Sequence, residues 1–314
     1  MKRKLRLGIQ LIGIGTFDVN RPGNVQGDEL VARCWQKYLT RLREVHAVTL
    51  YGPGNAPPKD VDVVIHFHPE LEPHPTARNF LYLQNVFPAE MYEGGTVGVF
   101  QRAKDRFEGY LFTSDRLMKA CAPGGVIPFA TDPELFKPTS PTSQTSRKPD
   151  NDWPAVTFVG NNIRGERCNQ RYLQPALPFG LAIYGNNLWE APLASVCRGK
   201  LAMESLPALY TTCDVNLNAH IPDHIAFDTP NQRLYDILAC GGFSISDRID
   251  SLEATFEDAV VTTDGDDDLW AKLVRTLADP ADRKRRGETG RRLVLDRHTY
   301  AHRSADVVKF LAAA

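Results

Sequence analysis

Three side chains that suit a phosphate site, Asn231, Arg233 and Asp236, stand just ahead of two glycines in FDTPNQRLYDILACGGFSISD, residues 227–247. If YDILACG ends a helix and GFSIS forms the next strand, they lie on or just before the first turn of that helix. Backbone N–H groups and the helix dipole favour an anion there. Arg233 can contact two phosphate oxygens at once, and Asp236 can accept two ribose hydroxyls. The pattern predicts a diphosphate site.

Two glycines, Gly241 and Gly242, follow this helix. They would permit a close backbone approach to a ligand or a positive φ at the helix C-terminus. The same stretch also suits a capped surface helix with a solvated salt bridge and a glycine stop. The local residues leave both interpretations open.

Turn residues after other strand-like runs extend the predicted diphosphate site. Gly160, Asn162 and Arg164 follow AVTFV, and this turn can supply backbone donors and one cation to phosphate. Its two asparagines can equally fill positions that tolerate left-handed φ. IYGNN, residues 183–187, is analogous and could touch a nucleobase. His220 ends VNLNAH, where its imidazole is either a contact to a ligand phosphate or a structural histidine.

The amino half offers further candidates for the cleft. Asp18 lies in GIGTFDVNRPGN, a turn-rich segment after the first strand-like run, and could act as a general base. In HFHPE, His66, His68 and Glu70 alternate in direction if the strand continues, and one of them could contact a ligand. His-x-His spacing also suits metal ligation on a strand, but without a third ligand in register no metal site is predicted.

Composition excludes several classes of protein. The chain has 314 residues, 42% of them hydrophobic, which suits two domains with real cores. A net charge of -1 gives no global field for nucleic acid or an anionic membrane, and RKRRGETGRR is best explained as a solvated helix face. Six cysteines without a Cys-x-x-Cys pair indicate a reducing cytoplasm. The apolar run in MKRKLRLGIQLIGIG is too short to span a membrane and predicts a first strand.

Short apolar runs alternate with helical patterns along the chain, six runs in the first half and five in the second. This alternation predicts α/β architecture with two Rossmann-like domains facing a cleft, which ligands enter beyond the carboxyl ends of the strands. A polar, proline-rich stretch separates the halves. We expect a first domain over residues 1–138, a linker over 139–154 and a second domain over 155–314, with the last helix packing back on the first domain.

Several segments over residues 155–305 resemble the carboxyl half of the CgeB-type glycosyltransferases, GT-B enzymes named for a spore-maturation protein. They are FVGNNIR, IYGNNLW, LPALYTTCDVNLNAH, NQRLYDILACGGFSISD and HTYAHR. VIPFATDPELFKP, residues 126–138, resembles the end of the amino-terminal GT-B domain. The first 120 residues resemble only a generic Rossmann-like domain.

The resemblance implies a cytoplasmic transferase that moves a sugar from a nucleoside diphosphate sugar, such as a UDP-sugar, to an acceptor hydroxyl without a cofactor or an obligatory metal. It implies that residues 1–138 form an acceptor-side domain and residues 155–314 a nucleotide-sugar-binding domain. In such an enzyme Asp18 could deprotonate the acceptor hydroxyl if the reaction inverts, His68 could contact the acceptor, and His220 could contact the donor sugar or a phosphate.

Many GT-B enzymes carry two glutamates eight positions apart, the first near the donor sugar and the second on the ribose. Asp228 and Asp236 have this spacing. The first position is not reliably acidic in the family that this sequence most resembles, so the resemblance favours Asp236 as the ribose ligand.

Two other functions remain open at this stage. A sugar-nucleotide epimerase or hydrolase can share this fold, and a non-catalytic nucleotide-sugar-binding subunit would keep the binding residues alone. The chain is short for a two-domain transferase, so a partner protein could supply acceptor recognition. Neither nucleic acid nor stable membrane insertion is expected. The sequence does not indicate the base, the sugar, the acceptor or the stereochemistry.

Overall fold

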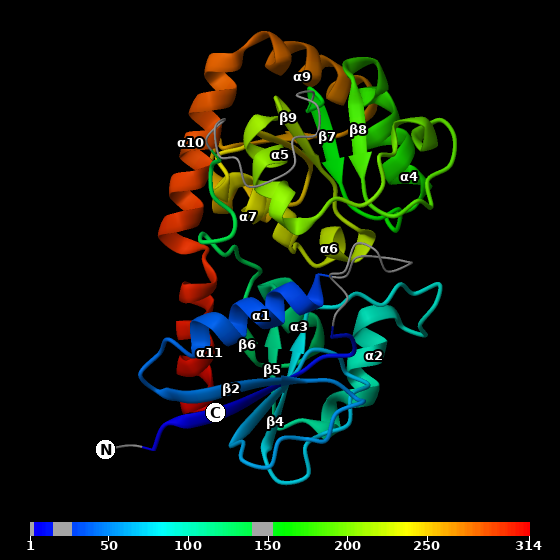
Figure 1. Ribbon diagram of the computed structural model, residues 1–314. Coiled ribbons are helices and arrows are strands. Elements are labelled where there is room, and N and C mark those ends of the chain that lie inside the picture. Colours follow the sequence, from blue (N-terminus) through cyan, green and yellow to red (C-terminus); the bar gives the residue numbers. More distant parts are fainter. Residues whose placement is uncertain (1–2, 15–26, 140–152) are drawn as a thin grey trace.

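Two parallel β-sheets, each flanked by helices, form the protein (Figure 1). The computed structural model describes residues 3–14, 27–139 and 153–314, so Asp18 and most of the expected linker lie outside the described residues. The first sheet has the strand order β2-β1-β3-β4-β5-β6. Its strands are β1 (Leu5–Gln10), β2 (Val45–Tyr51), β3 (Val63–His66), β4 (Arg78–Leu83), β5 (Gly109–Phe112) and β6 (Gly125–Val126).

The helices of the first domain begin after its strands, as expected for a parallel sheet. They are α1 (Asp28–Leu39), α2 (Gly95–Ala103), the short η1 (Lys104–Arg106) and α3 (Asp115–Cys121). In α1 the apolar side chains Val31, Trp35, Tyr38 and Leu39 recur at helical spacing and are buried. This helix lies on the side of the first sheet that faces the second domain (Figure 1).

The second sheet has the order β11-β10-β9-β7-β8. Its strands are β7 (Val156–Val159), β8 (Leu181–Tyr184), β9 (Val215–Asn218), β10 (Ser244–Asp247) and β11 (Val260–Thr263). The helices and helical turns around it are α4 (Glu166–Cys168), η2 (Asn169–Leu173), η3 (Gln174–Phe179), η4 (Leu193–Val196), η5 (Met203–Ser205), α5 (Leu206–Thr212), α6 (Pro222–Ala226), α7 (Gln232–Ala239), α8 (Ser251–Phe256), α9 (Asp266–Ala278) and α10 (Pro280–Arg297). The predicted pair of Rossmann-like α/β domains is confirmed.

The final helix, α11 (Tyr300–Ala313), returns to the first domain (Figure 1). It packs against α1, Phe310 makes an edge contact with Phe80 of β4, and Arg78 donates a hydrogen bond to the carbonyl of Leu311. A capping box of Thr299 and His302 starts α11 directly after α10. The chain therefore crosses between the domains a second time at its carboxyl end.

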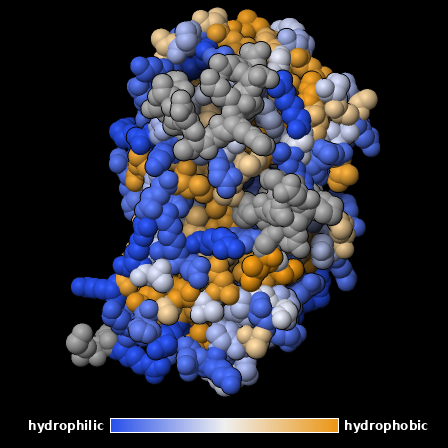
Figure 2. Space-filling model, viewed as in Figure 1, coloured by the Kyte–Doolittle hydropathy of each residue, from blue (hydrophilic) through white to orange (hydrophobic). Residues whose placement is uncertain are grey.

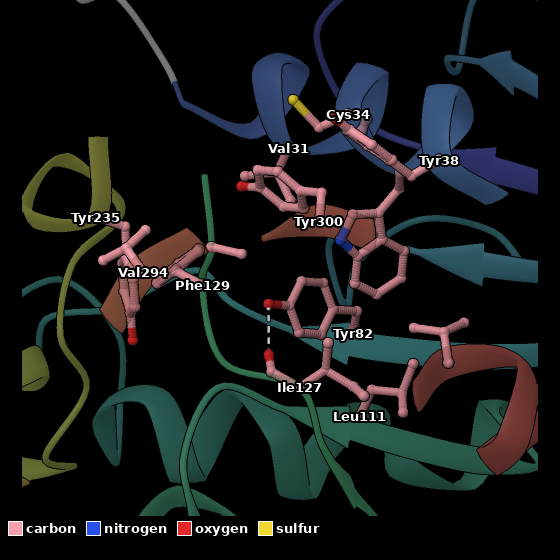
Figure 3. Packing of buried hydrophobic residues seen from close by; sticks show 14 of the residues in the cluster. Val31, Cys34, Tyr38, Tyr82, Leu111, Ile127, Phe129, Tyr235, Val294 and Tyr300 are labelled. Carbon is pink, nitrogen blue, oxygen red and sulfur yellow. Dashed lines mark hydrogen bonds between the residues drawn. The ribbon is translucent and has the colours of Figure 1, made fainter. Parts of the chain in front are cut away.

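One hydrophobic cluster joins the domains. It includes Val31 and Tyr82 from the first domain, Tyr235 from α7, Val294 from α10 and Tyr300 from α11. Figure 3 shows these side chains around the segment that leaves β6, where the Tyr82 hydroxyl donates to the carbonyl of Ile127 at 2.9 Å. The interface between the domains is thus an apolar core as well as a cleft.

Polar contacts also hold the segment around α6 against the first domain. Thr96 at the start of α2 donates to Asp223 at 2.5 Å, and Ser114, the N-cap of α3, donates to the carbonyl of Phe227 at 2.5 Å. Arg116 forms an ion pair with Asp250. These bonds fix the position of α6 at the edge of the cleft.

Candidate functional site

A cavity of about 600 Å³ lies between the two domains. Residues after β1, β3 and β4 line it on one side, and residues after β7, β8 and β9 line it on the other, together with the start of α7. These are carboxyl ends of parallel strands, where ligands bind in such sheets. In Figure 2 the waist between the domains shows hydrophobic side chains beside hydrophilic ones.

Two arginines, Arg164 and Arg233, lie side by side in the wall of this cavity. A Cβ atom added to Gly160 would be 3.0 Å from a guanidinium nitrogen of each. Both guanidinium groups also lie over the ring of Phe158, at 5.1 and 5.3 Å from its centroid. Because Gly160 has no side chain, it leaves space for the two guanidinium groups to lie next to each other.

The remaining contacts of these arginines are to uncharged groups. Arg164 donates to the carbonyls of Ala219 and Asn161, at 2.8 and 2.9 Å, and Arg233 donates to the Asn218 side chain at 3.2 Å. Within residues 3–14, 27–139 and 153–314, neither forms an ion pair with a carboxylate. Burial and the charge of Arg233 lower the pKa of Arg164 to about 9, and burial also lowers the pKa of Arg233. Two cations without an anion form a site that favours a polyanion.

The glycine turns after β7 and β8 interlock and hold Arg164 in place. The Gly160 N–H donates to the carbonyl of Tyr184, the Asn186 N–H donates to the Asn161 side chain, and the Asn162 N–H donates to the Asn186 side chain. The Asn162 side chain donates to the carbonyl of Leu188 at 2.8 Å. Asn162 does not line the cavity, so the expected donor contact is corrected to a role in shaping the turn.

Asn231 is the N-cap of α7, and Arg233 lies in the first turn, as predicted. The Asn231 side chain accepts a hydrogen bond from the Leu234 N–H at 3.3 Å. Asp236 lies in the second turn, which corrects the predicted position by one turn. It lines the cavity, is 5% exposed and accepts a 2.7 Å hydrogen bond from the Thr131 hydroxyl. Burial raises the pKa of Asp236, and the bond from Thr131 opposes this.

Gly241 and Gly242 terminate α7 far from its N-terminus, so their predicted donor-binding role is corrected. The Gly241 and Gly242 N–H groups donate to the carbonyls of Leu238 and Ile237, and Gly241 has φ +72°, which is a Schellman motif. A Cβ at Gly242 would be 2.4 Å from the carbonyl oxygen of Tyr210. The alternative that the sequence left open, a positive φ at the helix end, is what the structure has.

Asp228 does not line the cavity. Its carboxylate accepts a hydrogen bond from the Ser251 N–H at the start of α8, at 2.8 Å. Arg116 lies 3.9 Å away on its other side. With φ +53°, Asp228 makes the turn ahead of α7. The run DGDDD, residues 264–268, contains an Asp-x-Asp pattern of the kind that can hold a metal, but Asp264 and Asp266 pair with Arg248 and Arg171.

His220 lies behind the cavity wall and His224 on it. The His220 side chain is fully buried and its Nδ1 is 2.5 Å from Asp247, so its predicted contact with a donor does not fit this position. His224 on α6 lines the cavity, with its ring 6.3 Å from that of His220. Sequence reasoning missed His224, although IPDH directly follows the strand-like run that ends at His220.

His68 lines the cavity on the side of the first domain, and its contact with an acceptor stays a prediction. Its Nδ1 accepts a hydrogen bond from the Glu70 N–H at 3.2 Å, which places the proton of the neutral ring on Nε2. Burial lowers the pKa of His68, which favours this neutral form. His68 can therefore donate a hydrogen bond to a ligand through Nε2.

His224 makes the protein sensitive to acid. Burial, followed by the nearby charges of His220, Arg164 and Arg233, lowers the pKa of His224 to about 3 from an ordinary value of 6.5. The folded protein then binds fewer protons than the unfolded chain between these values. The stability gained by a neutral His224 is fully present above pH 6.5 and is lost as the pH falls toward 3.

We therefore expect His224→Gln to flatten the fall in the free energy of unfolding below pH 6.5, by up to about 1.4 kcal/mol for each pH unit. Urea unfolding at pH 5 and pH 7 measures this. His46→Gln, at an exposed histidine, is the control. Equal pH dependence in wild type and His224→Gln would contradict the prediction.

Neither a metal site nor a membrane-spanning helix is present among residues 3–14, 27–139 and 153–314. No three His, Cys, Asp or Glu side chains in that part of the chain come together as a metal site. Among the same residues, no helix combines the length and apolarity that crossing a bilayer requires. Independence from metal remains a prediction.

A family model described as glycosyl transferase-like matches residues 166–309, which include His224, Arg233 and Asp236. None of the curated proteins compared matches the chain. Among solved structures, Anabaena HepE in complex with UDP-glucose is similar over 99% of this chain and 100% of its own, with TM-score 0.68 and 13% identity. Sucrose-phosphate synthase from Thermosynechococcus elongatus gives 0.66 and 12%, with coverage of 99% and 100%. The fold is GT-B.

The GT-B fold extends to a more distant protein. BGT of phage T4, in complex with its UDP-glucose substrate, is similar over 98% of this chain and 99% of its own, with TM-score 0.62 and 11% identity. At these identities the likeness establishes architecture. The family model and the GT-B neighbours support the glycosyltransferase superfamily, and the CgeB-type subgroup rests on the sequence segments alone.

Proposed function

We propose that the protein is a glycosyltransferase of the CgeB type that moves a sugar from a nucleoside diphosphate sugar to an acceptor hydroxyl. The observation that carries this proposal is the pair of guanidinium groups of Arg164 and Arg233 in the cleft, without a carboxylate partner among the described residues. A diphosphate supplies the missing negative charge. HepE and T4 BGT, which share the GT-B fold, have UDP-glucose in their structures, which supports UDP as the nucleotide.

The arginine pair would act in the chemical step as well as in binding. When the bond from the anomeric carbon to the diphosphate breaks, charge develops on the leaving oxygen. Two cations already in place stabilise that charge without reorganisation of solvent. Burial of both guanidinium groups strengthens this interaction, because it is poorly screened.

The direct test is a thermal-shift screen with UDP, GDP, ADP, their sugars and the free nucleosides. A ligand that binds only the folded protein raises its melting temperature. We expect diphosphates to stabilise the protein and nucleosides to do so much less. A screen without selective stabilisation contradicts the proposal. Consumption of a donor sugar with no acceptor present, to an epimer or free sugar, would favour an epimerase or hydrolase.

Asp236 is proposed as the ribose ligand in the same site. Asp236→Asn keeps one acceptor oxygen where the carboxylate has two, so we expect it to weaken the ribose contact by about 1 kcal/mol. Calorimetry with UDP and 2′-deoxy-UDP measures this contact directly. Wild type should prefer UDP and the variant should not. Undiminished preference for UDP in the variant would remove Asp236 from the ribose site.

A further inference from the structure

Asp28 lies on the acceptor side of the cavity, at the first position of α1. Gly27, just before it, faces the start of α7 across the cleft: a Cβ there would be 4.0 Å from the Gln232 side-chain oxygen. Gln232 is the neighbour of Arg233. Asp28 therefore stands where the first domain meets the proposed diphosphate site.

The Asp28 carboxylate has one side-chain partner among the described residues. The Asn85 amide donates to its Oδ2 at 2.8 Å. This bond and one from the backbone N–H of Asp28 itself orient the carboxylate, whose Oδ1 has no side-chain partner among the described residues. Burial raises the pKa of Asp28 above its ordinary value, and Asn85 opposes this rise. A carboxylate with a raised pKa is a stronger base than one in water.

Amide groups beside Asp28 lack partners. Gln84 lines the cavity, is 6% exposed, and its Nε2 has no hydrogen bond within the described residues. The same is true of Oδ1 of Asn85, the residue whose amide donates to Asp28. Buried amides are normally satisfied, and two such atoms on Gln84 and Asn85, next to the bond from Asn85 to Asp28, indicate that a hydroxyl-bearing ligand belongs there.

The other groups that line the cavity are poorly suited to take a proton. Asp236, the second carboxylate among the described lining residues, accepts from Thr131 and lies on the donor side. His224 is held neutral beside two arginines, which disfavour its protonation. The Nδ1 atom of His68 is already engaged by the Glu70 N–H.

We propose that Asp28 is the general base of the transfer and that the reaction therefore inverts the anomeric centre. This inference rests on the proposed function. The Asp28 carboxylate accepts the proton of the acceptor hydroxyl while that oxygen forms a bond to the anomeric carbon. The bond from this carbon to the diphosphate breaks, and its electron pair leaves with the diphosphate, beside Arg164 and Arg233. Asp28 ends the step protonated.

The experiment compares wild type, Asp28→Asn and Glu29→Gln. Glu29 is the next residue of α1 and does not line the cavity, so its variant controls for the loss of a negative charge at this helix start. UDP affinity is measured by calorimetry. Release of UDP from UDP-glucose, UDP-galactose and UDP-N-acetylglucosamine is measured with water as the acceptor. NMR identifies the first anomer of the released sugar.

Asp28→Asn should reduce turnover by about 100- to 10,000-fold, the usual contribution of a general base, with UDP affinity within about twofold of wild type. Glu29→Gln should keep the turnover of wild type, and the first sugar released from an α-linked donor should be the β-anomer. Turnover in Asp28→Asn within about threefold of wild type, or release of the α-anomer first, would overturn the assignment. Wild type that binds no UDP and consumes no donor would instead refute the proposed function.

Discussion

Replacing Arg233 with alanine is expected to weaken UDP binding by about 1.5 to 3 kcal/mol, the range for hydrogen bonds to a charged group. Arg233 and Arg164 meet beside Gly160 without a carboxylate partner among the described residues, so a bound diphosphate would be their counter-ion. Uridine lacks the diphosphate, and its affinity should barely change. Isothermal calorimetry with UDP and uridine measures both effects.

Arg248→Ala is the matched control, because Arg248 is an exposed arginine of the same domain that pairs with Asp264. It should leave UDP affinity unchanged. The free protein supplies a second check: removal of one of two adjacent, unpaired cations should not lower its stability, since their repulsion is relieved. Equal losses of affinity for uridine and UDP would show that Arg233 does not contact the diphosphate.

Replacing Gly185 with alanine is expected to lower the free energy of unfolding by about 3 kcal/mol, at the upper end of overpacking effects. The added Cβ would lie 1.9 Å from the Gly160 carbonyl oxygen, and backbone cannot move aside as a side chain can. Because the turns after β7 and β8 are interlocked, the strain should also displace Arg164 and weaken UDP binding. Urea unfolding measures the stability.

Gly54→Ala is the control for this substitution, because a Cβ at Gly54 would meet no atom within 4 Å. It should unfold at the same urea concentration as wild type, or slightly higher. A Gly185→Ala protein with a wild-type unfolding midpoint and wild-type UDP affinity would show that the two turns separate easily, contrary to the packing described.

The strands were predictable because apolar runs bounded by glycine, proline and polar residues produce them regardless of their partners. The N-cap at Asn231 and the first-turn position of Arg233 were predictable for a similar local reason. The proximity of Arg164 and Arg233 was not predictable. Arg164 follows β7 and Arg233 lies on α7, which comes after β9, so their proximity depends on β7 and β9 being neighbours in the sheet. Strand order is set by packing between distant segments, and a single sequence does not display it.

Asp28 illustrates a different limit. In the sequence it is one of two acids in GDEL at the start of a helical pattern, where a negative charge is favourable for the helix dipole alone. Its neighbour Glu29 has the same local signal but forms an ion pair with Arg33. Asp28 differs from Glu29 in that it lines the cavity and accepts a hydrogen bond from Asn85. His224 was missed for the same reason, since its exposure to the cleft arises from contacts of α6 with the first domain.

The shared hydrophobic cluster limits how this chain can be recombined. Tyr235, Val294 and Tyr300 pack with residues of the first domain, and α11 covers α1 although it follows the second sheet in the chain. A chimaera made by exchanging one half with another transferase would have to rebuild this whole contact. Either half of the chain, produced alone, would expose a large apolar surface and aggregate. Transplanting donor specificity therefore requires substitutions within the cleft, with the two halves kept together.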